Sequence, residues 1–203
     1  MEELIKIENL SKSFRTNAVL KNVNLSIRPG ELIHIQGSNG CGKSTLFKII
    51  VGLLDQDSGE IIQSENLNLG ALIENPGFDE RSTLLSNLKF LCSISRIDFP
   101  EQTVRNLCQK LDLNLDLKTK MKDFSLGMRQ KAGIIQAIME DQNLILLDEP
   151  TRGLDQKSIA EFIDLIHFLT KSGKSVVIAS HDLTNDIPYT KKYVLENGIL
   201  CSL

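Results

Sequence analysis

The sequence predicts an α/β fold with a mostly parallel sheet core, and three observations support this class. The glycine-rich stretch "GSNGCGKST" (37–45) follows the apolar segment "ELIHI" and precedes the aliphatic run Leu46–Leu54, which predicts the order strand, loop, buried helix. Further along, "NLILL" and "SVVIAS" are short continuous apolar runs, typical of strands buried on both faces of a parallel sheet. Between them lies an amphipathic helical segment, as a connection between parallel strands requires.

The segments on either side of this pattern complete the predicted core. "LIKIENL" and "VLKNVNLSI" alternate between apolar and polar residues and predict strands, which we expect to form an antiparallel part near the N-terminus. Gly59 opens another short strand, and "LNLGALIE" (67–74) predicts a further one. At the other end of the chain, "YVLENGIL" predicts a hairpin that turns at Asn197-Gly198.

The middle of the chain has a different pattern. "TLLSNLKFLCSIS", "PEQTVRNLCQKL" and "MRQKAGIIQAIM" carry apolar residues three and four positions apart, which predicts helices, with Pro100 in a first turn. We therefore expect one domain over 1–203, with a core from 1–75 and 142–203 and an inserted helical subdomain over 76–141.

The composition excludes several classes of protein. With 203 residues the chain has room for one full-sized domain, and a net charge of −3 without long basic runs argues against a nucleic-acid coat protein. The N-terminus lacks a secretory pattern, and no apolar stretch reaches the roughly 18–20 residues of a membrane span, so a membrane role would need a separate partner chain. The four scattered cysteines are expected to be reduced thiols.

Gly37-x4-Gly42-Lys43-Ser44 fits the phosphate-binding P-loop pattern. Glycines allow consecutive backbone N–H groups to converge on phosphate oxygens, and the helix N-terminus attracts the same anion. Lys43 is expected to reach the β- and γ-phosphates, and the Ser44 hydroxyl to ligate Mg²⁺. A glycine-rich turn that only caps a core helix is the alternative, but the predicted strand before and helix after favour the P-loop. The expected nucleotide contacts are Gly37, Ser38, Asn39, Gly40, Cys41, Gly42, Lys43, Ser44 and Thr45.

An acidic pair forms the second element of the predicted site. Asp148 and Glu149 follow the four aliphatics Leu144–Leu147, at the carboxyl end of a buried strand, where ligands bind in open parallel sheets. Asp148 is expected to hold Mg²⁺ with its hydration sphere, and Glu149 to polarise the attacking water.

Together these motifs resemble the nucleotide-binding subunit of an ATP-binding cassette (ABC) transporter, over essentially the whole chain. "FSLGMRQK" (124–131) matches the signature segment, "TRGLD" (151–155) the D-loop, and "SHD" around His181 the switch histidine. Glu74 occupies the Q-loop position, and Phe14 the place of the aromatic ring that stacks on adenine.

The resemblance implies ATP as substrate and Mg²⁺ as cofactor, with Glu149, His181 and Lys43 as catalytic residues. Glu74 would lie near the metal and Asp155 near the nucleotide. Ser125 and Gly127 would read the γ-phosphate held by the opposite subunit. The implied assembly is an ATP-dependent head-to-tail dimer, bound to a separate transmembrane permease on the cytoplasmic face of the cell membrane, without nucleic acid.

The signature and the Q-loop depart from the commonest pattern of the family. Leu126 and Met128 replace the first Gly and the Gln of Leu-Ser-Gly-Gly-Gln, and Glu74 replaces a glutamine. With "GALIENPGF" (70–78), these departures are similar to the branch of transporters that confers resistance to bacitracin and lantibiotic-type peptides. Members of that branch usually continue past the last hairpin, whereas this sequence ends at Leu203.

Other functions fit less well. A soluble ABC-type ATPase acting on ribosomes or DNA usually carries two cassettes, a long coiled coil or basic extensions, which this sequence lacks. A regulator that binds nucleotide without turnover is disfavoured because Lys43, Asp148, Glu149 and His181 are all present. A GTPase is disfavoured because no Asn-Lys-x-Asp motif occurs.

Overall fold

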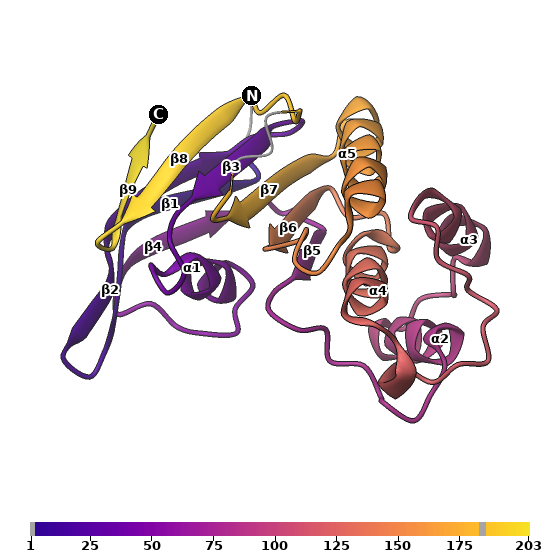
Figure 1. The fold of residues 1–203 in the computed structure, drawn as a ribbon. Helices are drawn as coiled ribbons and strands as arrows, with labels where there is room; N and C mark the ends of the chain where they lie inside the picture. The colour runs from indigo at the N-terminus through magenta and orange to yellow at the C-terminus, as the bar shows by residue number, and fades with distance from the viewer. Residues whose placement is uncertain (1–2, 183–185) are drawn as a thin grey trace.

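The computed structural model describes residues 3–182 and 186–203, which fold into two sheets and a group of helices (Figure 1). In chain order the elements are β1 (Ile5–Phe14), β2 (Asn17–Ile27), β3 (Leu32–Gln36), α1 (Lys43–Ile50), β4 (Ser58–Gln63), β5 (Leu69–Leu72), α2 (Leu84–Ser95), α3 (Glu101–Lys110), the 3₁₀ turn η1 (Met121–Asp123), α4 (Leu126–Ile138), β6 (Leu144–Asp148), α5 (Gln156–Lys171), β7 (Ser175–Ser180), β8 (Lys191–Glu196) and β9 (Ile199–Ser202).

The larger sheet has the strand order β5-β6-β7-β3-β8-β9, and all of its pairings are parallel except β8 with β9. The smaller sheet, β2-β1-β4, is antiparallel. This arrangement confirms the predicted fold class, with a mostly parallel sheet core and an antiparallel N-terminal part. The terminal hairpin turns at Asn197 and Gly198 as predicted, and both residues have the positive φ values, 51° and 82°, of a tight hairpin turn.

The central strands of the larger sheet face a hydrophobic cluster on each side. Alternate residues of β6 face opposite clusters: Ile145 and Leu147 pack with α4 and α5, whereas Leu144 and Leu146 pack with α1 and the smaller sheet. Because successive side chains of a strand point to opposite faces, a continuous apolar run is what a strand between two cores requires.

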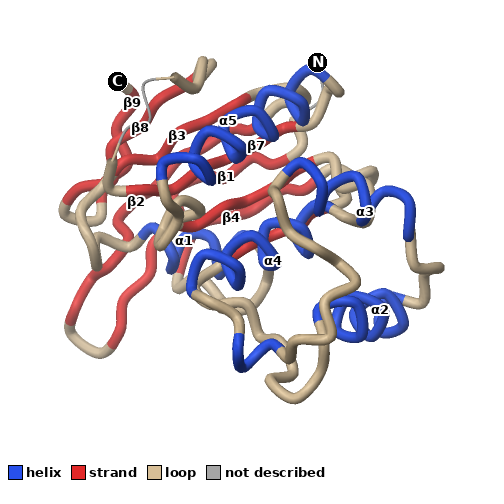
Figure 2. Tube along the Cα trace, turned by 45° about the vertical axis from the view of Figure 1, so that its right-hand side comes forward, coloured by secondary structure: helices blue, strands red, loops and turns tan. Residues whose placement is uncertain are grey.

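Helices α2, α3 and α4 occupy the region predicted to be helical, on the side of the molecule away from β8 and β9 (Figures 1 and 2). Their apolar side chains do not form a separate core, since they share one cluster with α5 and with one face of the larger sheet. The boundaries of a helical subdomain at 76 and 141 stay a prediction.

Helix α1 ends earlier than the aliphatic run Leu46–Leu54 predicts. The helix stops at Ile50, and Leu53 is exposed. Gly52 has φ 73° and its N–H donates to the Ile49 carbonyl at 3.1 Å, while the Leu53 N–H donates to the Lys48 carbonyl at 2.8 Å. These two bonds form a Schellman C-cap, in which a glycine with left-handed backbone ends the helix despite the apolar residues that follow.

Two further observations bear on the environment of the protein. Over residues 3–182 and 186–203, no helix combines the length and the apolar character that crossing a membrane would require. Cys41, Cys92, Cys108 and Cys201 are free thiols, as the sequence predicts.

Candidate nucleotide-binding site

The glycine-rich loop between β3 and α1 has the backbone that a P-loop needs. Gly40 and Gly42 have φ values of 79° and 115°, in the region that only glycine adopts readily. A Cβ atom on Gly42 would lie 3.1 Å from side-chain atoms of Val19 and Leu20, so the loop is also packed tightly against β2. Substitution of Gly42 is therefore opposed by both backbone conformation and space.

Lys43 is the first residue of α1, and its ammonium group lies back across the loop. The Nζ atom donates to the carbonyl oxygens of Gly37 at 2.6 Å and Ser38 at 3.3 Å. It also lies 3.3 Å from Oε1 of Glu149, at the end of β6. The side chain is only 5% exposed, so this charge is held in place by specific partners at the mouth of the loop.

Ser44 and Asp148 meet below the same loop. The Ser44 hydroxyl donates to Oδ2 of Asp148 at 2.5 Å. Burial raises the pKa of the Asp148 carboxyl above its usual value, although the hydrogen bond from Ser44 opposes this rise. The other oxygen, Oδ1, is buried without a hydrogen-bond partner among the residues described. Mg²⁺ prefers oxygen ligands, and this carboxylate oxygen and the neighbouring serine hydroxyl are both of that type. Phosphate oxygens of a nucleotide would supply further ligands.

Glu149 has an unusual backbone for a non-glycine residue, with φ 45°. Two hydrogen bonds hold this conformation: its N–H donates to the Ala179 carbonyl at 2.8 Å, and its carbonyl accepts from Gln130 Nε2 at 3.1 Å. Strained backbone that is fixed by its neighbours is characteristic of functional sites. The carboxylate is aimed at Lys43 on one side and at His181 on the other, where Nδ1 lies 2.9 Å from Oε2.

Two pockets share the residues Ser44, Asp148 and Glu149. The first, of about 290 Å³, runs along the P-loop. Phe14 lines its far side with a half-exposed ring, and Lys12 Nζ lies 5.7 Å from the ring centroid. This pocket brings Phe14 and the loop together on one surface, while the role of Phe14 in stacking on adenine stays a prediction. Its lining is Phe14, Val19, Asn39, Gly40, Gly42, Lys43, Ser44, Thr45, Asp148 and Glu149.

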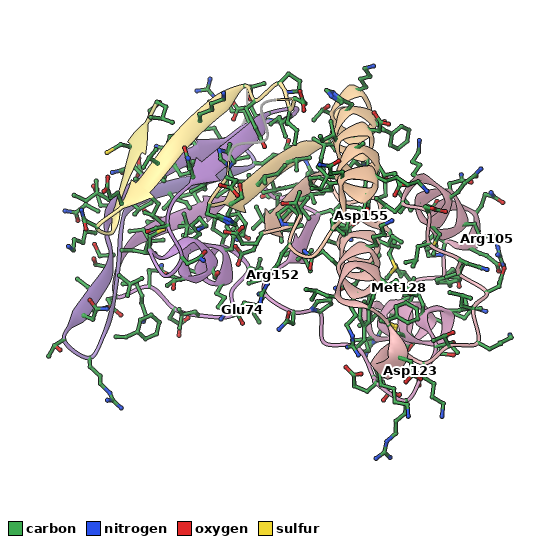
Figure 3. All side chains as sticks on the ribbon, viewed as in Figure 1. Glu74, Arg105, Asp123, Met128, Arg152 and Asp155 are labelled. Carbon is green, nitrogen blue, oxygen red and sulfur yellow. The ribbon has the colours of Figure 1, made fainter. Side chains whose placement is uncertain are left out.

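The second pocket, of about 310 Å³, lies on the other side of Asp148 and contains Glu74 and Arg152, which Figure 3 shows near one another. Glu74 has φ 57°, and its Oε1 atom pairs with Lys48 Nζ at 2.6 Å. The predicted Q-loop residue therefore lies at the site and is tied to α1, the helix that carries the P-loop. Its carboxylate is more than half exposed and faces the same space as Asp148.

Several predicted site residues lie outside the lining of these two pockets: Gly37, Ser38, Cys41, Ser125, Gly127, Asp155 and His181. Ser125 caps α4 by accepting from the Met128 N–H at 3.2 Å, and Gly127 lies within the first turn of that helix rather than before it. Asp155 caps α5 by accepting from the Ser158 N–H at 2.8 Å. Figure 3 shows Met128 and Asp155 toward α4 and α5, apart from Glu74. Within one chain Ser125 and Asp155 act as helix caps.

Cys41 belongs to the loop by sequence, but its side chain is directed elsewhere. It lines a different hollow of about 390 Å³ with residues such as Ala18 and Glu196, and it packs against the cluster around α1. A contact of Cys41 with nucleotide is therefore confined to its backbone.

Several residues that line or support the site had no role assigned from the sequence, among them Val19, Lys48, Asn75, Gln130 and Arg152. Gln130 lies inside the signature segment and could have been noticed as a polar residue on the apolar face of a predicted helix, where it is 5% exposed. Lys48 carries no comparable signal, because its partner Glu74 lies 26 residues away in the sequence. Arg152 lies in the "TRGLD" segment directly after the acidic pair, and this position was a signal available from the sequence.

A family model described as "ABC transporter" matches residues 20–152 of this chain, from β2 through the acidic pair. The chain belongs to the ABC transporter family. As an ATP-binding cassette of this family, it is the ATP-binding subunit of an ABC transporter and an ATPase.

Two curated relatives of this ABC cassette are named for the transport of a lantibiotic and of bacitracin. The lantibiotic transport ATP-binding protein SrtF of Streptococcus pyogenes is 35% identical over 189 residues, which cover 89% of this chain and 81% of that protein. The bacitracin transport ATP-binding protein BcrA of Enterococcus faecalis is 32% identical over 195 residues, covering 91% of this chain and 63% of that protein.

Solved structures of other ABC cassettes share the fold. An ATP-binding subunit of an ABC transporter has a TM-score of 0.87 at 25% identity, covering 98% of this chain and 90% of that one. The cassette MJ0796, in a dimeric post-hydrolysis state bound to ADP and Pi, has a TM-score of 0.85 at 26% identity, covering 97% and 96%.

Proposed function

We propose that this cassette hydrolyses ATP between the P-loop and the end of β6 and thereby drives a separate membrane permease. The observation that carries this proposal is the convergence of Lys43, Ser44, Asp148 and Glu149 on one pocket, with His181 in contact with Glu149. Each side chain has the chemistry that phosphoryl transfer to water requires: a cation, two groups for a metal, a base and a polar partner for the base.

Lys43 binds the β- and γ-phosphates in this proposal by exchanging its present partners for phosphate oxygens. The backbone N–H groups of the loop and the N-terminus of α1 add positive potential at the same place. Glu149 orients the attacking water and accepts its proton through the carboxylate that now faces Lys43 and His181. His181 holds that carboxylate through the contact of its Nδ1 atom with Oε2.

Mg²⁺ would be held by the Ser44 hydroxyl and Asp148, with Glu74 close by. When bound, the cation neutralises developing charge on the phosphates. One oxygen of Asp148 is buried without a hydrogen-bond partner among the residues described, and burial raises the pKa of this carboxyl, so a cation here would offset the cost of the buried charge. We keep Glu74 as a proposed contributor because it lines the same pocket as Asp148.

A second cassette completes the site in our proposal. Ser125, Gly127 and Asp155 lie outside the pocket of their own chain, so a contact with nucleotide requires a head-to-tail partner that presents them in trans. The N-terminus of α4, capped by Ser125, is an anion-binding element of the kind that can read a γ-phosphate. The dimeric form of MJ0796 supports this assembly.

We propose an antimicrobial peptide or drug as the transported substrate and the cytoplasmic face of the membrane as the place of action. Support for the substrate comes from the names of SrtF and BcrA. The permease is proposed to bind near Glu74 and the helices that follow it. An ABC-type ATPase acting on ribosomes or DNA is the alternative, and recovery of the tagged protein with ribosomes rather than membranes would favour it.

Glu149→Gln tests the hydrolytic mechanism. The change keeps the shape of the side chain and removes the base, so we expect ATP binding to persist while steady-state hydrolysis falls by about 10³-fold. With ATP, the variant should elute as a dimer in size exclusion, because the ATP-bound assembly no longer reopens.

Glu60→Gln is the matched control, because this exposed carboxylate lies on β4, outside the lining of both pockets. It should hydrolyse ATP at the wild-type rate. Wild-type turnover in Glu149→Gln would show that another group acts as the base.

A further inference from the structure

His34 is a buried polar side chain in the strand that leads into the P-loop. It lies on β3 between β7 and β8 and is 0% exposed. Its ring stacks obliquely beside Tyr189, with centroids 4.9 Å apart. An aliphatic residue would fill such a position without the cost of desolvating an imidazole, so the polar contact that His34 makes calls for an explanation.

The hydrogen bonds of the Ser180 hydroxyl determine the tautomer of the His34 ring. The Ser180 hydroxyl has one proton and donates it to the Asp182 carbonyl at 2.6 Å. His34 Nε2 lies 2.8 Å from the same hydroxyl oxygen, and it must therefore be the donor. This requires the tautomer with hydrogen on Nε2, which leaves Nδ1 as a bare acceptor.

The surroundings keep this tautomer neutral. Nδ1 is buried without a hydrogen-bond partner among the residues described, so a second proton there would find no acceptor. Burial, helped by the charges of Lys192 and Lys43 and opposed by Glu149, lowers the pKa of His34 to about 4. His34 is therefore a fixed hydrogen-bond donor at neutral pH.

Two further contacts connect the Ser180 hydroxyl to the proposed catalytic residues. Ser180 and Asp182 flank His181, so the bond from the Ser180 hydroxyl to the Asp182 carbonyl closes a tight turn around the histidine. From this turn, His181 Nδ1 contacts Oε2 of Glu149 at 2.9 Å. The Ser180 carbonyl also accepts from the Gly37 N–H, at 3.3 Å, which links the turn to the start of the P-loop.

We propose that His34 is a positioning residue for hydrolysis: by donating to Ser180 from inside the sheet, it holds the 180–182 turn so that His181 aims at Glu149. This inference rests on the proposed hydrolytic roles of His181 and Glu149. His34 itself is absent from the lining of both pockets, so it acts on the rate of the reaction and not on nucleotide binding.

The test compares two substitutions of His34. Leucine fills a similar volume without a donor, whereas glutamine can place an amide N–H near the position of Nε2. We expect His34→Leu to lower kcat about tenfold with KM for ATP and the affinity for a fluorescent ATP analogue unchanged, because only the turn is misplaced. His34→Gln should restore most of the rate. His167→Leu, on α5, is the control and should leave kcat unchanged.

Ser180→Ala provides the second half of the test. It should lower kcat as His34→Leu does, and the double variant should be no slower than either single one, because both changes break the same bond. Additive effects, a glutamine variant as slow as the leucine variant, or a loss expressed in KM would each overturn the proposal. No turnover in the wild-type protein would instead count against the proposed function.

Nitrogen NMR tests the geometry without any activity measurement. The chain has three histidines, so comparison with His34→Gln and His167→Leu assigns the ring signals. We expect His34 to show the neutral tautomer with hydrogen on Nε2, unchanged between about pH 5 and 8, and to shift in Ser180→Ala. A ring that titrates in this range, or that ignores the loss of the Ser180 hydroxyl, would contradict the assignment.

Discussion

Asp148 shows how one side chain at the site works against the stability of the fold. It is 5% exposed, its pKa is raised by burial, and one of its oxygens lacks a hydrogen-bond partner among the described residues. A carboxyl group whose pKa is higher in the folded than in the unfolded protein binds its proton more tightly when folded. Ionised Asp148 therefore destabilises the fold at neutral pH, and that destabilisation fades as the pH falls through the raised pKa.

Asp148→Asn should separate stability from activity. The amide has the same shape and no charge, so we expect the free energy of unfolding without ligand to rise by about 1 kcal/mol, or roughly 2–4 °C in Tm. The gain should shrink as the pH falls through the raised pKa of the Asp148 carboxyl, where the wild-type side chain takes up a proton. Mg²⁺-dependent hydrolysis should be lost.

Thermal unfolding followed by circular dichroism at several pH values checks this prediction, with Glu60→Gln as the control. A variant less stable than the wild type at neutral pH would show that Ser44 and Lys43 more than offset the cost of burying the charge.

At the scale of elements, β5 and α4 approach each other more closely than side chains would allow. A Cβ atom on Gly70 would lie 1.8 Å from the Ala137 carbonyl oxygen and 2.8 Å from Cγ of Gln142. Nearby, a Cβ on Gly133 of α4 would meet Leu72 and Pro76 at 2.7 and 2.9 Å. These contacts set the distance between the sheet edge and the helix that carries Gln130.

Gly70→Ala should therefore destabilise the protein by about 1–3 kcal/mol or more, since the methyl group can be accommodated only if β5 and α4 move apart. Gly77→Ala is a matched control, because a Cβ there has nothing within 4 Å and its backbone needs no positive φ. Chemical denaturation measures the free energy of unfolding of both variants. Equal denaturation midpoints for the two variants would mean that β5 can move away from α4 at little cost.

The elements were predictable to different degrees, for physical reasons. The runs Leu144–Leu147 and Val176–Ala179 are apolar at every position because alternate side chains face two different clusters, and such short continuous runs predicted buried strands from the sequence. The predicted end of α1 was wrong, because the C-cap at Gly52 stops the helix even though the residues after it are apolar. Partners such as Lys48 for Glu74 and Ser180 for His34 depend on packing between distant segments, which local pattern does not encode.

On the scale of the whole molecule, the larger sheet lies between two hydrophobic clusters and contributes side chains to both. The helical region depends on the cluster that also contains Phe162 of α5 and Ile178 of β7, while the P-loop helix depends on the other. Since one sheet supports both clusters, loosening of either exposes apolar surface of the same strands. We infer that the chain unfolds as one cooperative unit.

A single calorimetric transition should therefore be observed, and Mg²⁺-ATP should shift it as a whole. Ligand at 100 times Kd adds about 2.7 kcal/mol of stability, which raises Tm by roughly 5–10 °C in a chain of this size. Lys43→Met should unfold in the same single transition but lose the shift. Two separated transitions in the wild type would show that the helical region is an independent unit.

The present partners of Lys43 affect the affinity for nucleotide. The ammonium already has two carbonyl oxygens and a carboxylate around it. Each phosphate contact therefore replaces an existing interaction, and the net affinity is a difference between two similar terms. When the products leave, the lysine has those oxygens and Glu149 to return to. A cassette that releases ADP in every cycle benefits from this arrangement, because the side chain that we propose to bind the phosphates would also assist their release.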